Sequence, residues 1–210
     1  VFYLRNGDIP QYMRDGVVDL AIIGENLLTE KGKNLEVIEQ LGFSRCKVSI
    51  AVPKNTEFND VKDLEGKRIA TSYPNTVKAF LETNQIKADL HIINGSVEIA
   101  PNIGLADAIC DIVSSGSTLF KNNLKEVIEI SRSQAVLVRA PQVSEETKET
   151  IKKLRFRIQS VLRAKKSKYI LLNVPNNKIK AVSSILPVLK SPTILPLAQD
   201  GWSSLHSVIS

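Results

Sequence analysis

The sequence predicts an α/β fold, because short apolar runs alternate along most of the chain with segments of helical periodicity. Two further observations refine this prediction. A strongly basic amphipathic segment occupies residues 148–168, and the residues after it read in the order strand, helix, strand, strand. At 210 residues the chain has room for one large domain or two modest ones.

Strands account for most of the apolar runs. Each run is short, is rich in β-branched residues and ends at a glycine, a proline or a polar turn. In the part of the chain before the basic segment, such runs predict strands within residues 17–24, 47–53, 63–71, 88–94, 107–113 and 126–140, where the third follows a turn at Gly66 and the last contains one or two strands.

Two helices are predicted between these strands. Residues 74–84 open on a proline and turn Val77, Phe80 and Leu81 inward at helical spacing. Residues 95–106 predict a second helix, in which Ser96 is the N-cap and Glu98 stands in the first turn.

The basic segment at 148–168 predicts an amphipathic helix with a solvated basic face. Its apolar residues recur at helical spacing and basic residues stand between them; the apolar set is Ile151, Leu154, Ile158, Val161 and Leu162. The net charge of +6 would suit a polyanionic partner such as nucleic acid or a phosphorylated metabolite. No nucleic-acid reading motif accompanies the segment, so we expect no nucleic-acid partner.

Several classes of protein are excluded by composition. No run approaches the roughly 18 apolar residues of a membrane span, and the first residues do not resemble a signal peptide, so we expect no membrane partner. The two cysteines and two histidines show neither disulfide nor metal-site spacing. We therefore expect a reducing, cytoplasmic location and no direct metal cluster.

The residues after the basic segment predict a separate small module. Strand, helix, strand and strand fall at residues 168–175, 177–187, 191–198 and 202–210. This order matches the opening of a ferredoxin-like β-α-β-β-α-β unit, without its second helix and last strand.

The segment DAICDIVSSGSTLF, residues 107–120, carries the clearest chemical signal. On a strand, Asp107, Ile109, Asp111 and Val113 share one face, and small residues follow. The turn 114–118 offers backbone N–H groups and hydroxyls, which could hold a phosphate while the acids face a sugar diol, with or without magnesium. From spacing alone, a serine-rich turn capped by an aspartate is equally compatible.

The turn resembles the phosphoribosyl-pyrophosphate (PRPP) loop of phosphoribosyltransferases, although Cys110 interrupts the usual acidic pair. Five further stretches stand in order along the whole length of the chain: GVVDLAIIGEN, GKRIATSYPN, NGSVEIAP, GLADAICD and SPTILPLA. Together they resemble the ATP phosphoribosyltransferase family in its long form, the first enzyme of histidine biosynthesis.

The resemblance implies a catalytic region of the two-lobed, type II periplasmic-binding-protein-like fold, followed by a partial ferredoxin-like (ACT-like) regulatory module. Lobe I would comprise residues 1–46 and 130–165, and lobe II residues 47–129 with the PRPP loop. The regulatory module would comprise residues 166–210.

The resemblance also implies the activity, a transfer of the 5-phosphoribosyl group of PRPP to N1 of ATP with release of pyrophosphate and with Mg²⁺ as cofactor. The 5-phosphate would lie on Ser114, Ser115, Gly116, Ser117 and Thr118. Asp111, Asp107 and Glu98 would face the ribose hydroxyls. The Mg²⁺ would be held through the substrate, with Asp111 as the candidate for a direct ligand. Because the transition state has oxocarbenium character, negative charge near the ring is favourable.

For ATP, the resemblance implies contacts from Arg5, Asn26, Leu27 and Tyr73. Arg5 could instead be a surface arginine, and Tyr73 could merely pack against the start of its helix. Asn26 stands where some members have aspartate, and its amide can both donate to and accept from adenine.

In the last module, the resemblance implies feedback inhibition by histidine, with contacts from Asn173, Leu189 and Thr193. It also implies a homo-oligomer, either a dimer or a hexamer. Members of the family have a strand and a basic, glycine-containing loop before the position of Val1. We therefore expect these 210 residues alone to show little or no turnover.

Two other functions compete with this interpretation. A solute receptor has the same two-lobed fold without catalysis, but it would be exported and would not need the acids beside a phosphate loop. A regulatory module that binds an amino acid through the last residues alone would leave the phosphate loop unexplained.

Overall fold

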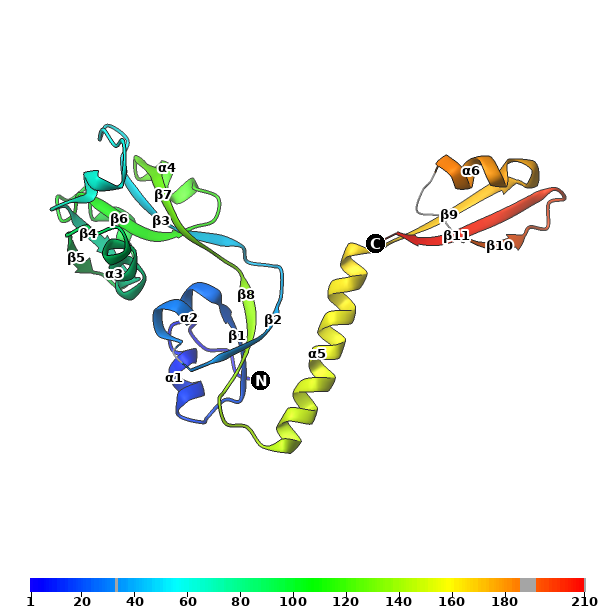
Figure 1. Ribbon diagram of the computed structural model, residues 1–210, viewed down its shortest axis with the longest axis horizontal. Coiled ribbons are helices and arrows are strands. Elements are labelled where there is room, and N and C mark those ends of the chain that lie inside the picture. The colour runs from blue at the N-terminus through cyan, green and yellow to red at the C-terminus, as the bar shows by residue number, and fades with distance from the viewer. Residues whose placement is uncertain (33, 186–191, 210) are drawn as a thin grey trace. The chain divides into compact units, whose positions relative to one another are not determined.

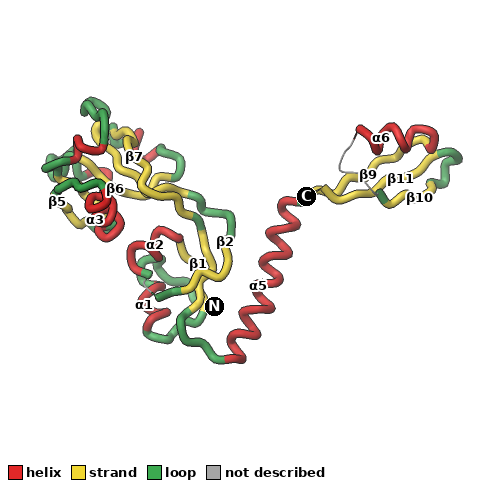
Figure 2. Tube along the Cα trace, viewed as in Figure 1, coloured by secondary structure: helices red, strands yellow, loops and turns green. Residues whose placement is uncertain are grey.

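The computed structural model describes residues 1–32, 34–185 and 192–209. Its contacts divide the chain into two compact units, Val1–Lys148 and Glu149–Ser210. The boundary falls inside α5 (Glu145–Lys166), and the boundary predicted between residues 165 and 166 falls near the carboxyl end of the same helix. Figure 2 shows how helices and strands alternate along the trace.

The first unit contains two sheets, each with its own helices, which we call lobe I and lobe II (Figure 1). Lobe I has an antiparallel sheet in the order β1-β8-β2, made of β1 (Leu20–Gly24), β8 (Ala135–Arg139) and β2 (Glu36–Gln40). The helices α1 (Ile9–Arg14) and α2 (Glu25–Lys31) belong to the same lobe. Met13 of α1 packs with Ile23, Val136 and Val138 in its core.

Lobe II has a five-stranded sheet in the order β5-β4-β6-β3-β7. The strands β5, β4 and β6 run parallel, and β3 pairs antiparallel with both β6 and β7. Their bounds are β3 (Cys46–Pro53), β4 (Arg68–Thr71), β5 (Asp89–Ile92), β6 (Ala108–Val113) and β7 (Leu124–Ser133).

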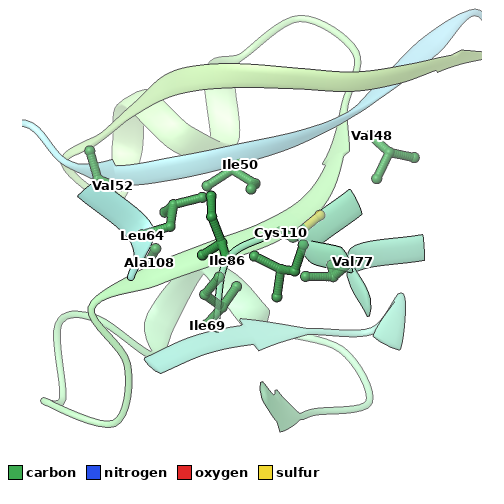
Figure 3. Packing of buried hydrophobic residues seen from close by; sticks show 10 residues of the cluster. Val48, Ile50, Val52, Leu64, Ile69, Val77, Ile86, Ala108 and Cys110 are labelled. Carbon is green, nitrogen blue, oxygen red and sulfur yellow. The ribbon is translucent and has the colours of Figure 1, made fainter. Parts of the chain in front are cut away.

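Each face of the lobe II sheet is covered by an apolar layer. On one face, Val77 and Leu81 of α3 (Pro74–Thr83) and Leu64 of η1 (Val61–Leu64) pack against Ala108 and Cys110 of β6 (Figure 3). On the other face, the cluster contains residues of η2 (Val97–Ile99) and α4 (Ser117–Lys121), together with Ile109 and Val113. This alternation puts Asp111 on the face of Ile109, as predicted.

The predicted strands of this unit are present, and so is the helix at 74–84. The helix predicted at 95–106 is wrong: only one 3-10 turn forms, at Val97–Ile99. Ser96 has a φ of 52° and makes no side-chain capping bond, and Gly104 has a φ of 73°, so the backbone leaves the helical region on both sides of this turn. The sequence reading also missed α1, α2 and β2.

The second unit contains the rest of α5 and a three-stranded antiparallel sheet in the order β10-β11-β9. Its elements are β9 (Lys168–Pro175), η3 (Asn176–Lys178), α6 (Ile179–Ile185), β10 (Thr193–Pro196) and β11 (Trp202–Ile209). This confirms the predicted order of strand, helix, strand and strand. In the described part of the chain, no helix is long and apolar enough to cross a membrane.

Candidate active site

The carboxyl ends of the parallel strands β4 and β6 face a cleft of about 740 Å³ between the two lobes of the first unit. Lobe II contributes the residues that follow β4, β5 and β6, among them Ser72, Tyr73, Asn94 and Ser114. Ligands of open α/β sheets bind at this end of the strands. Lobe I contributes the end of β1 and the start of α2, and its lining residues include Gly24, Asn26, Leu27 and Lys31.

The serine-rich turn after β6 forms a smaller pocket of about 70 Å³. Gly116 has a φ of 73°, a left-handed conformation that lets the turn close without strain. The lining contains the whole predicted phosphate loop, Ser114 to Thr118, together with Glu98 and Asp111. Since Ser114 lines both the pocket and the cleft, the two spaces adjoin.

The loop is open to solvent. The side chains of Ser114, Ser115, Ser117 and Thr118 are exposed, so no packed side chains seal the turn. The hydroxyl oxygens of Ser115 and Ser117 lie 3.0 Å apart and form a hydrogen bond with each other. A turn of small residues with exposed hydroxyls and accessible backbone N–H groups can accept an anion.

Asp111 and Glu98 both line this pocket. Burial is the main cause that raises the pKa of Asp111, and the negative charge of Glu98 raises it further. The backbone N–H of Ile112 donates a 2.8 Å hydrogen bond to Oδ1 of Asp111 and opposes the shift. Two carboxylates in one pocket form a site whose ionised state a bound cation would stabilise.

Asp107 does not join this pair. It precedes β6, so it lies four residues from Asp111, about 13 Å along an extended chain. Its Oδ1 accepts a 2.8 Å bond from the Arg68 guanidinium, and its Oδ2 accepts a 3.0 Å bond from the Arg68 backbone N–H. These bonds lower the pKa of Asp107 to about 2. Asp107 shares the predicted face but stands at the other end of the strand.

Three of the four residues expected to contact ATP line the same cleft. Asn26 and Leu27 come from the first turn of α2, and Tyr73 directly precedes α3. Arg5 is exposed and is not among the cleft-lining residues, although the next residue, Asn6, is.

The amide of Asn26 already has protein partners. Its Nδ2 donates to the Tyr73 hydroxyl at 3.1 Å, and its Oδ1 accepts from the Ser133 hydroxyl at 2.9 Å. An amide has two donor hydrogens and two acceptor lone pairs, so one of each remains for a ligand. Burial, followed by the charge of Asp111, raises the pKa of Tyr73 to about 12, and the phenol therefore stays protonated at neutral pH.

The second unit holds the residues expected to bind the inhibitor. Asn173 of β9 pairs with Ser204 of β11, and Thr193 of β10 pairs with His206 of β11. Because Ser204 and His206 are two residues apart on one strand, these four side chains share one face of the sheet. Leu189 lies outside the described residues.

The sequence reading missed several cleft residues. Ser72 and Asn94 follow the ends of β4 and β5, and Gly95 comes next; Lys31 and Arg45 come from lobe I and the connection after it. The strand ends themselves were a usable signal, because parallel strands present their carboxyl ends at one edge. In the residues that the structure describes, no three His, Cys, Asp or Glu side chains gather as a metal site.

Known families and proteins match the chain along its length. The family profile described as ATP phosphoribosyltransferase matches residues 5–160, and the profile described as HisG, C-terminal domain, matches residues 164–210. The ATP phosphoribosyltransferase of Cytophaga hutchinsonii is 56% identical over 209 residues, which are 100% of this chain and 73% of that protein. The enzyme of Phocaeicola vulgatus is 51% identical, with 100% and 74% covered.

Solved structures show the same relationship. The ATP phosphoribosyl transferase (HisG:HisZ) complex from Thermotoga maritima matches with a TM-score of 0.69 and 30% identity, over 78% of this chain and 79% of that one. A substrate-binding protein of an amino acid ABC transporter matches with a TM-score of 0.58 at 16% identity, over 78% and 73%, and shows the two-lobed fold alone. The chain belongs to the ATP phosphoribosyltransferase family, the enzymes of the first step of histidine biosynthesis.

Proposed function

We propose that the chain binds PRPP at the serine-rich turn and ATP in the adjoining cleft, the two substrates between which its family transfers the phosphoribosyl group to N1 of ATP with release of pyrophosphate. The observation that carries this assignment is the joint lining of one small pocket by residues 114–118, Asp111 and Glu98. A receptor without catalysis would share the fold but would not need two carboxylates beside an anion loop.

The 5-phosphate is assigned to the turn. A Cβ added at Gly116 would have no heavy atom within 4 Å beyond its neighbours in the chain. The backbone there is therefore open to close approach by a ligand. The exposed hydroxyls of Ser115, Ser117 and Thr118 add donors around it. Ser114, where the pocket meets the cleft, marks the direction in which the ribose would extend.

Asp111 and Glu98 are assigned to the ribose. As the bond to pyrophosphate breaks, positive charge develops on the ring, and fixed carboxylates beside it stabilise that charge. Adenine N1 is already a nucleophile, so the main task of the cleft residues is to hold it in line with the ribose C1. We assign no catalytic contact to Asp107, because its carboxylate is occupied by Arg68.

A divalent cation fits this pocket. Phosphoribosyltransferases that use PRPP generally need one, and the paired carboxylates offer the oxygen ligands that Mg²⁺ prefers. Two carboxylates fill only part of an octahedral shell, so the remaining ligands would be substrate oxygens and water. Bound there, Mg²⁺ would neutralise charge on the departing pyrophosphate.

For ATP, the proposed contacts are Asn26, Leu27 and Tyr73. The free donor and acceptor of the Asn26 amide can pair with N7 and N6 of adenine, which leaves N1 free to react, and the buried Tyr73 ring supplies an apolar wall. Arg5 stands one residue before the cleft-lining Asn6, so we assign it to the phosphate end of ATP, outside the adenine site.

Regulation is assigned to the second unit. The face shared by Asn173, Thr193, Ser204 and His206 has hydroxyl, amide and imidazole groups that suit a zwitterionic amino acid, and we propose histidine as this ligand. We also propose a homo-oligomer in the cytoplasm. The Thermotoga maritima relative is a HisG:HisZ complex, which supports assembly into an oligomer. Cys46 and Cys110 are free thiols, which supports a reducing compartment.

Calorimetric titration with PRPP, in the presence and absence of Mg²⁺, tests the proposed function. We expect binding that requires Mg²⁺, that is lost in Asp111→Asn and that survives in the matched variant Asp107→Asn. Equal loss of binding in the two variants, or binding of PRPP that ignores the metal, would contradict the assignment.

A further inference from the structure

Glu30 is a buried carboxylate near the end of α2. Its residue exposure is 5%, and in the described part of the chain no ion pair includes it. A buried charge is costly unless hydrogen bonds compensate it. The position of its partners therefore shows why the carboxylate is tolerated there.

All its side-chain partners lie in the other lobe. One carboxylate oxygen of Glu30, Oε1, accepts from the backbone N–H of Asn75 at 2.9 Å. The other, Oε2, accepts from the backbone N–H and the hydroxyl of Thr76, each at 2.9 Å. The side-chain amide of Asn75 donates back to the Glu30 carbonyl at 2.9 Å. These four bonds, which we call the Glu30 clasp, join α2 of lobe I to α3 of lobe II.

The clasp replaces a missing cap. The N-cap position of α3 is Tyr73, whose side chain makes no capping bond, and Pro74 has no N–H. The N–H groups of Asn75 and Thr76 therefore lack a partner within their own helix. Glu30 accepts both, as an N-cap side chain would, but it comes from a different lobe.

The two helices that the clasp joins also carry the proposed adenine site. Asn26 stands four residues before Glu30, so the two side chains lie on the same face of α2, one turn apart. Tyr73 directly precedes α3, and its hydroxyl accepts from Asn26. The Glu30 clasp and the Asn26–Tyr73 bond are thus two successive links between α2 and the start of α3.

We propose that Glu30 is a positioning residue, which sets the spacing of the two lobes and so holds Asn26 and Leu27 opposite Tyr73. It touches no substrate in this arrangement. The proposal rests on the assignment of ATP to this cleft, and it predicts an asymmetry between the ligands. The serine-rich turn lies entirely within lobe II, so its affinity for PRPP does not depend on the clasp.

Glu30→Gln tests the proposal, with Glu25→Gln as the matched control on the same helix. The glutamine amide keeps one acceptor oxygen, but its NH2 group faces a backbone N–H of Asn75 or Thr76, from which it cannot accept, so at least one bond of the clasp is lost. We expect the dissociation constant for ATP to rise at least about tenfold, which is the effect of losing a hydrogen bond to a charged group. The constant for PRPP with Mg²⁺ should change less than about twofold, and Glu25→Gln should change neither.

If Glu30 had a purely structural role, Glu30→Gln would change the dissociation constants for ATP and PRPP together, or would change neither. Either result overturns the proposal. Amide hydrogen exchange gives a second readout that needs no ligand. Exchange at Asn75 and Thr76 should accelerate at least about tenfold in Glu30→Gln and stay unchanged in Glu25→Gln. If the unsubstituted chain binds neither ligand, the proposed function fails, and unaccelerated exchange would separately overturn the clasp.

Discussion

The hydroxyl oxygen of Tyr73 accepts a 3.1 Å hydrogen bond from Nδ2 of Asn26, although the two residues are 47 positions apart and belong to different lobes. Both side chains are buried, at 8% and 7% exposure. Both residues line the cleft that we assign to ATP. It also uses half of the donor capacity that Asn26 could offer to adenine.

Tyr73→Phe should therefore affect both stability and ATP binding. It leaves a buried Nδ2 of Asn26 without this acceptor, so the free energy of unfolding should fall by about 1 kcal/mol. ATP affinity should fall severalfold, while PRPP affinity stays the same. Urea unfolding and calorimetry measure these effects. The control is Tyr12→Phe, which alters an exposed tyrosine of α1. Equal effects of the two substitutions would contradict the prediction.

Gly116→Ala should weaken PRPP binding about tenfold. A φ of 73° costs a residue with a side chain about 1 kcal/mol, and relaxation of the turn would misdirect its N–H groups. Gly104→Ala is a matched control, since Gly104 also has a φ of 73° and has open space where the Cβ of an alanine would stand. Both variants should lose similar stability in urea unfolding. If Gly104→Ala weakened PRPP binding as much, the loop would have no specific role.

Asp107 should contribute to stability in a pH-dependent way. Its pKa is lowered from 3.8 to about 2 in the folded chain, so its contribution is complete above pH 3.8 and disappears as the pH falls toward 2. Because the side chain is 38% exposed, solvent screening limits the contribution to about 1 kcal/mol or less. The difference in unfolding free energy between the unsubstituted chain and Asp107→Asn should thus shrink between pH 5 and 3. A difference that is constant across this range would refute the ion pair.

Asp111 should show the opposite sign. Its pKa is raised by burial and by Glu98, so the folded state loses stability as the pH rises above 3.8 and through the raised pKa. At neutral pH, Asp111→Asn should leave the free energy of unfolding unchanged or increase it, while Mg²⁺-dependent PRPP binding is lost. Urea unfolding at pH 7 beside the binding titration checks this. A destabilised Asp111→Asn variant would mean that the carboxylate is structural.

Local patterns in the sequence were sufficient for most of the fold. The strands of lobe II are apolar runs, and the helix at 74–84 has a proline start and inward Val77 and Leu81, which the structure buries. The helix expected at 95–106 failed because the left-handed conformation of Ser96 is not apparent from its residue type. The seven-residue α2 was too short to show a helical period.

The site was predictable where it depends on local sequence. The turn 114–118 follows Asp111 directly, and the structure keeps them in one pocket. The alternation of side chains along a strand predicted the face of Asp107 correctly. It could not reveal the partner of Asp107, Arg68, which is 39 residues away. Glu30 was missed for the same reason, because its partners in α3 lie 45 and 46 residues away.

A crystal structure of the chain with Mg²⁺ and PRPP tests the central claim most directly. The account predicts the 5-phosphate within hydrogen-bonding distance of the backbone N–H groups of residues 115–118, with the ribose hydroxyls directed at Asp111 and Glu98. A sugar phosphate bound at another edge of the sheet, with the serine-rich turn empty, would contradict it.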